Sequence, residues 1–78
     1  MAGIKKKILL DLDGVLNTYT KDFNPNLIPP IKDGAVEFLK QLSKDYEIVL
    51  FTVRDKILAE KWIAQNNLQK YITGVTNI

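Results

Sequence analysis

The feature that most constrains this chain is an apolar run that ends in two carboxylates and a glycine. Residues 8–17 read ILLDLDGVLN. A short, continuous apolar run bounded by a turn signal predicts a buried strand. Charges at the end of a buried strand are unfavourable unless another group compensates them. Asp11 and Asp13, followed by the turn at Gly14, therefore predict a site where a divalent cation and a phosphate meet the sheet.

Length and composition limit the chain to a single soluble unit. Its 78 residues suffice for one domain at most, and 46% hydrophobic content argues against disorder. The net charge of +2 does not indicate a nucleic-acid binder, and Lys5–Lys7 is interpreted as a solvated lead-in to the first strand. The sequence contains neither cysteine nor histidine, which excludes disulfides, thiolate metal sites and histidine-based catalysis.

No part of the sequence indicates a membrane segment. No apolar run approaches the roughly 18 residues that a membrane span needs, and the N-terminus lacks a signal-peptide core. We therefore expect a cytoplasmic protein.

The hydrophobic periodicity predicts alternating strands and helices. The expected elements are a strand over Lys7–Leu12, a helix from Asp33 to Lys44, a strand over Glu47–Val53, a helix over Lys56–Asn66 and a third strand within 71–76. Both complete strands are apolar enough to be buried on both faces. This order predicts an α/β fold with a parallel sheet and right-handed crossovers.

Local signals place the ends and the buried faces of the helices. Asp33 is the expected N-cap of the first helix, and an apolar stripe follows it. The stripe consists of Ala35, Val36, Phe38, Leu39 and Leu42. In the second helix Trp62 is expected to anchor the core, and Asn66-Asn67 suits a left-handed helix end.

The connection 17–32 is long for a structureless segment, and such loops are often functional. We expect its apolar residues Phe23, Leu27, Ile28 and Ile31 to hold it against the body of the protein. Tyr19 lies just past the carboxylates, where it either covers the site or packs within the loop.

Three polar residues should converge in space. Strands of a parallel sheet end at the same edge, where ligands bind. Asp11 and Asp13 end the first strand and Thr52 ends the second. Neighbouring strands lie about 4.8 Å apart, so these groups can share one pocket. A carboxylate can attack phosphorus, and a second one can protonate the leaving oxygen and later activate water.

Two segments resemble motifs of the haloacid dehalogenase (HAD) superfamily of phosphatases and phosphotransferases. Residues 11–16, DLDGVL, resemble its first motif, and residues 50–52, LFT, resemble its second motif. The resemblance runs from about Lys7 to Asn77 and implies a Rossmann-like, three-layer parallel sheet. It also implies Mg²⁺ as cofactor.

The resemblance assigns the catalytic and metal-binding roles to the two carboxylates. Asp11 would be the nucleophile and a metal ligand. Asp13 would be the general acid and base, with its backbone carbonyl on the metal.

Four further residues receive substrate-binding roles. Thr52 would donate a hydrogen bond to the phosphoryl group, and Leu12 and Gly14 would supply backbone contacts. By its position alone, two residues after Thr52, Arg54 is expected to reach a substrate phosphate or sugar; the alternative interpretation is a solvated or helix-entry residue.

The family also carries a later lysine and further acidic residues, which do not appear in this sequence. We therefore expect residues 1–78 to be the N-terminal part of a HAD-like domain, apparently truncated, with weak metal binding and little turnover. The loop 17–32 is too short for a separate cap domain, so the site should be open or completed by another subunit of an oligomer.

The predicted function is Mg²⁺-dependent hydrolysis of a small phosphomonoester, with a nucleotide as one candidate substrate. Two alternatives stay open. One is a non-catalytic phosphate- or metal-binding module, or an inactive truncated homologue. The other is a phosphotransferase, which the short loop argues against because excluding water normally needs a closing cap.

Overall fold

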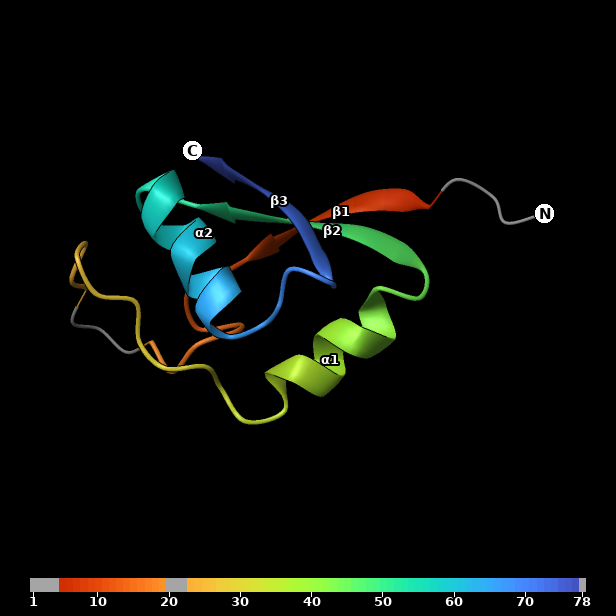
Figure 1. The fold of residues 1–78 in the computed structure, drawn as a ribbon, viewed down its shortest axis with the longest axis horizontal. Helices are drawn as coiled ribbons and strands as arrows, with labels where there is room; N and C mark the ends of the chain where they lie inside the picture. Colours follow the sequence, from red (N-terminus) through yellow and green to blue (C-terminus); the bar gives the residue numbers. More distant parts are fainter. Residues whose placement is uncertain (1–4, 20–22, 78) are drawn as a thin grey trace.

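The computed structural model describes residues 5–19 and 23–77, and it contains three strands and two helices (Figure 1). The elements are β1 (Lys6–Asp11), α1 (Ala35–Leu42), β2 (Tyr46–Thr52), α2 (Lys56–Gln65) and β3 (Ile72–Asn77). The strands form one parallel sheet in the order β1-β2-β3. The predicted alternation of strands and helices and the parallel sheet are confirmed.

One face of the sheet carries the core. Ile48 and Leu50 of β2 pack in the same buried cluster as Ile72 and Val75 of β3, together with residues of both helices. The prediction that the strands are buried on both faces is wrong, because Leu9 on the other face of β1 is 57% exposed. The described helices pack against a single face, so they and the sheet form two layers, and a three-layer arrangement stays a prediction.

Helix α1 begins one residue later than the capping signal indicated. Gly34 occupies the N-cap position with a φ of 84°, and no side chain caps the helix there. Asp33 is therefore not the N-cap. Glycine adopts this left-handed conformation without the strain that a Cβ would cause. The helix ends at Leu42, two residues before the predicted end at Lys44.

The predicted apolar stripe of α1 is correct only in part. Ala35 and Leu39 are buried and Leu42 packs against the core. Val36 and Phe38 are each 45% exposed, because only one narrow face of this short helix contacts the sheet.

Helix α2 matches the sequence prediction closely. The side chain of Asp55 accepts a hydrogen bond from the backbone N–H of Leu58 and so caps the first turn. Trp62 is buried in the core, as expected for an anchor. Asn67 adopts a φ of 57°, which confirms the left-handed end of the helix.

The two ends of the loop between β1 and α1 pair with each other, and the loop runs past the carboxyl ends of the strands (Figure 1). Asn17 and Ile31 form an antiparallel bridge, and the N–H of Thr18 donates to the carbonyl of Pro30 at 3.0 Å. Ile28 is buried and Ile31 packs against the core, as predicted, whereas Phe23 and Leu27 are 43% and 64% exposed. The loop is held where its two ends pair and by the contacts of Ile28 and Ile31 with the core.

Candidate active site

The predicted convergence of carboxylates and threonine at the carboxyl edge of the sheet is observed. Asp11 ends β1 beside Phe51, and Thr52 is the next residue of β2. Asp11, Asp13 and Thr52 line one cavity of about 280 Å³. Asp11 is exposed to this cavity's solvent, whereas Thr52 is buried. The parallel register thus joins residues that lie some forty positions apart in sequence.

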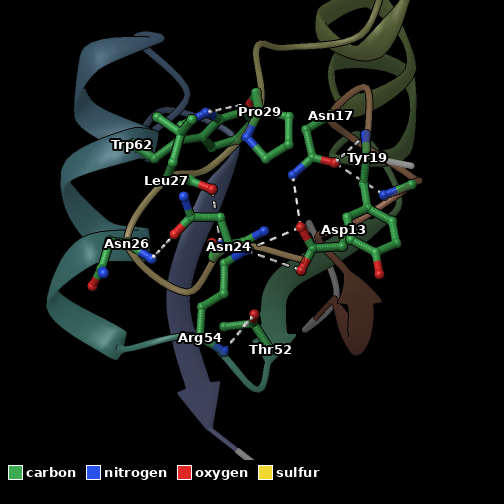
Figure 2. A network of polar contacts seen from close by, with 11 residues as sticks. Asp13, Asn17, Tyr19, Asn24, Asn26, Leu27, Pro29, Thr52, Arg54 and Trp62 are labelled. Carbon is green, nitrogen blue, oxygen red and sulfur yellow. Dashed lines mark hydrogen bonds and ion pairs between the residues drawn. The ribbon is translucent and has the colours of Figure 1, made fainter. Parts of the chain in front are cut away.

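The carboxylate of Asp13 is held by two side chains (Figure 2). The Nε of Arg54 donates to Asp13 Oδ1 at 3.0 Å and to Oδ2 at 3.1 Å. The Nδ2 of Asn17 donates to Asp13 Oδ1 at 3.0 Å. The Arg54 side chain is fully buried and that of Asp13 is 15% exposed, so this ion pair is sheltered from water. Its attraction is stronger there than at the surface.

Arg54 also ties the site to the loop. Its Nη1 donates to the carbonyls of Asn24 at 2.7 Å and Leu27 at 3.1 Å, and its guanidinium carbon lies 4.5 Å from the ring centre of Phe23. The alternative interpretation of Arg54 as a solvated residue is wrong, because the residue is only 2% exposed. Its phosphate-binding role stays a prediction, since the guanidinium contacts the acid and the loop; its Nη2 is buried without a described partner.

Thr52 lines the cavity together with the two carboxylates. Its Oγ1 accepts a hydrogen bond from the backbone N–H of Arg54 at 3.0 Å. This contact leaves the hydroxyl hydrogen free to be donated elsewhere. The side chain of Asn77, at the end of β3, donates to the carbonyls of Thr52 at 3.2 Å and Arg54 at 2.6 Å. The backbone at the end of β2 is therefore held by the side chains of both Thr52 and Asn77.

The turn after β1 depends on Gly14 and Asn17. Gly14 has a φ of 80°, and its N–H donates to Asn17 Oδ1 at 3.0 Å. The carbonyl of Leu12 accepts hydrogen bonds from the N–H groups of Val15 and Leu16, and the Leu12 side chain is in the core. The backbone contacts of Leu12 and Gly14 with a phosphate stay predictions, although the Gly14 N–H already has an internal partner.

Sequence reasoning missed Asn17 and Asn77 as site residues. Asn17 directly follows a turn, where this residue type is common for conformational reasons alone, and Asn77 is the last residue of β3. Only the folded structure shows that each side chain bridges two or more groups of the site. Tyr19 lines the cavity together with Phe23 and Phe51, which favours the interpretation that Tyr19 covers the site.

The donor set for a metal ion is small in the part of the chain that the structure describes. No cluster of three or more histidine, cysteine, aspartate or glutamate residues occurs there. Asp11 and Asp13 at the cavity are nevertheless suitable for Mg²⁺, which prefers oxygen ligands, keeps several waters and is commonly held by one or two carboxylates plus substrate phosphate. Within 5–19 and 23–77, no helix is long and apolar enough to cross a membrane.

Comparison with known proteins places the chain in a family. A family model described as NLI interacting factor-like phosphatase matches residues 6–76. Searches of curated proteins and of solved structures gave no significant match. The matched range includes both carboxylates, the glycine turn and Thr52, which the fold brings to one cavity. The chain therefore belongs to the NLI interacting factor-like phosphatases, a family of HAD-like phosphatases.

Proposed function

We propose that this chain carries the nucleophile and the acid–base of a Mg²⁺-dependent phosphatase that hydrolyses a phosphomonoester through an aspartyl-phosphate. The observation that carries the proposal is that Asp11, Asp13 and Thr52 line one cavity at the carboxyl edge of a parallel sheet. Membership of a phosphatase family supports it.

Each residue has a defined part in the proposed reaction. A carboxylate oxygen of Asp11 attacks phosphorus, the bond to the ester oxygen breaks, and a proton from Asp13 passes to that oxygen to give the free alcohol. Water then attacks the phosphorus of the aspartyl-phosphate and gives its proton back to Asp13. This second step releases inorganic phosphate and regenerates the Asp11 carboxylate.

The surroundings of the two carboxylates serve this chemistry. The Thr52 hydroxyl donates to a phosphoryl oxygen and orients it for in-line attack. Asp11 and the backbone carbonyl of Asp13 would hold Mg²⁺, which supplies positive charge next to the phosphoryl oxygens. Tyr19, Phe23 and Phe51 line the same cavity, and their rings offer apolar contact to a planar leaving group. That lining supports an aryl phosphate or a nucleotide as substrate.

The test is a search for the covalent intermediate at high protein concentration. The chain is mixed with Mg²⁺ and 4-nitrophenyl phosphate, quenched with acid, and mapped by mass spectrometry for a phosphoryl group. We expect the adduct on Asp11 and nitrophenolate release that needs Mg²⁺. Because only a carboxylate can form the acyl phosphate, Asp11→Asn should abolish both signals and leave the fold intact.

Asp45→Asn is the matched control, because Asp45 is exposed and lies at the opposite edge of the sheet. It should retain both signals. Turnover that persists in Asp11→Asn would refute the nucleophile assignment. Phosphate or Mg²⁺ binding without any adduct or hydrolysis would instead favour the non-catalytic binding module.

A further inference from the structure

Two hydrogen-bond donors converge on a single oxygen of Asp13. Oδ1 receives the Nε of Arg54 and the Nδ2 of Asn17, both at 3.0 Å, while Oδ2 has only the shared Arg54 contact at 3.1 Å (Figure 2). Guanidinium and amide N–H groups donate and do not accept. A proton on Oδ1 would therefore face two donors, whereas Oδ2 can carry a proton and keep Oδ1 bonded to both partners.

The orientation of Asn17 is fixed by its other contacts. Its Oδ1 accepts from the backbone N–H groups of Gly14 and Tyr19, each at 3.0 Å. A flipped amide would place N–H₂ against two N–H donors, so the Nδ2 must face Asp13. The residue is only 1% exposed, so these contacts are shielded from bulk solvent.

The orientation of the Arg54 guanidinium is likewise fixed by contacts other than those with Asp13. The loop carbonyls of Asn24 and Leu27 hold Nη1, and the Phe23 ring lies against the guanidinium. Arg54 is also the sole arginine of the sequence. Its planar fork reaches the acid and the loop at once, which a lysine ammonium does not do.

We propose that Arg54 and Asn17 are positioning residues that hold Oδ1 of Asp13 and reserve Oδ2 for proton transfer to and from the substrate. This inference rests on the proposed function and deepens it. Asp13 must act as donor in the first step and as acceptor in the second. With Oδ1 bonded to the same two donors in both states, the carboxyl group keeps one orientation while the proton on Oδ2 leaves and returns.

The same guanidinium fixes the wall of the cavity. Phe23 lines the cavity and contacts Arg54, and the carbonyls that bind Nη1 belong to the segment that follows it. One side chain therefore sets both the direction of the acid and the position of the loop beside it.

The first test separates positioning from simple loss of structure. We compare kcat/KM for 4-nitrophenyl phosphate, whose leaving group needs little protonation, with kcat/KM for glycerol 2-phosphate, whose alkoxide needs a proton. Arg54→Lys and Asn17→Ser should lower the alkyl-to-aryl ratio by about 10- to 100-fold, since a misdirected acid loses part of its general-acid contribution. Partial unfolding reduces both rates equally and leaves this ratio unchanged.

Lys56→Gln is the control, because Lys56 is exposed at the start of α2 and does not line the cavity. Its alkyl-to-aryl ratio should equal that of the unaltered chain. An unchanged ratio in both positioning variants would show that Arg54 and Asn17 act only in folding, and it would overturn the inference.

The second test detects the hydrogen bond between Arg54 Nε and Asp13 without measuring catalysis. A single arginine gives a single Nε–H resonance in a ¹⁵N spectrum, and we expect it to exchange slowly and to move in Asp13→Asn. A fast-exchanging signal would show that the bridge does not form and would overturn the inference. A protected signal in a chain that hydrolyses neither ester would refute the proposed function, and the positioning role with it, while the bridge itself would stand as structural.

Discussion

The two ends of the strands each carry an ion pair, one sheltered from water and the other exposed to it. At the carboxyl edge, Arg54 and Asp13 form a sheltered ion pair with several further hydrogen bonds. At the amino edge, Lys7 and Glu47 lie 3.8 Å apart with side chains 63% and 42% exposed. An exposed pair contributes little because water and salt screen it, whereas a buried pair must be complete to be tolerated.

Cavity size alone would have pointed to the wrong edge. The amino edge has the larger hollow, of about 370 Å³, lined by Lys5, Lys70 and Tyr71 among others. The Nζ of Lys5 donates to the backbone carbonyl of Ser43 there. No described carboxylate at this edge accepts hydrogen bonds from two side chains, as that of Asp13 does. The smaller cavity of about 280 Å³ at the carboxyl edge contains the fixed carboxylates. Organisation of the polar groups, not volume, distinguishes the candidate active site in the described residues.

The largest expected difference between the edges comes from removing one cation of each pair. Arg54→Gln should lower the free energy of unfolding by about 3–5 kcal/mol, because it leaves Asp13 sheltered and unpaired. Lys7→Gln should lower it by less than about 1 kcal/mol. Urea unfolding with a stabilising osmolyte measures both. The double variant Arg54→Gln/Asp13→Asn should recover part of the loss, and equal losses at the two edges would contradict the comparison.

A smaller difference is expected for polar side chains without charge. Asn17→Ala removes three hydrogen bonds and leaves the N–H groups of Gly14 and Tyr19 without a partner, so we expect a loss of about 2–3 kcal/mol. Thr73→Ala at the amino edge removes an exposed contact with Glu47 and a partly buried one with the carbonyl of Ile48, and it should lower the free energy of unfolding by under about 1 kcal/mol. Thermal unfolding followed by circular dichroism would distinguish them. Comparable shifts in Tm would show that the turn after β1 is not organised by Asn17.

The smallest expected effect concerns the backbone itself. A Cβ at Gly14 or at Gly74 would meet no atom within 4 Å, but only Gly14 has a left-handed φ, of 80°. Gly14→Ala should therefore lose about 1 kcal/mol through strain, whereas Gly74→Ala should be neutral or stabilising by up to about 1 kcal/mol. Chemical unfolding resolves a difference of this size. If Gly74→Ala lowers the free energy of unfolding as much as Gly14→Ala does, the left-handed φ of Gly14 does not explain the loss.

Local chemistry explains which parts of the fold were predictable. The apolar strands and the left-handed Asn67 follow from residue type and spacing, and both are observed. The N-cap at Gly34 was not predicted, because the sequence pattern favoured the side chain of the preceding aspartate, which does not cap the helix. Burial of one strand face only was also missed, since an apolar run does not say how many faces the rest of the chain covers.

The sequence by itself determined the ingredients of the site: two carboxylates at the end of one strand, a threonine at the end of the next, and a glycine turn between strand and loop. Because neighbouring parallel strands end at the same edge of the sheet, these groups must lie close together. Only the tertiary structure decided what surrounds them. The partners of Asp13 come from the turn after β1 and from the segment after β2, and the guanidinium of Arg54 reaches a loop some thirty residues away. Such contacts depend on side-chain direction and burial, and neither quantity is encoded in the local pattern of the sequence.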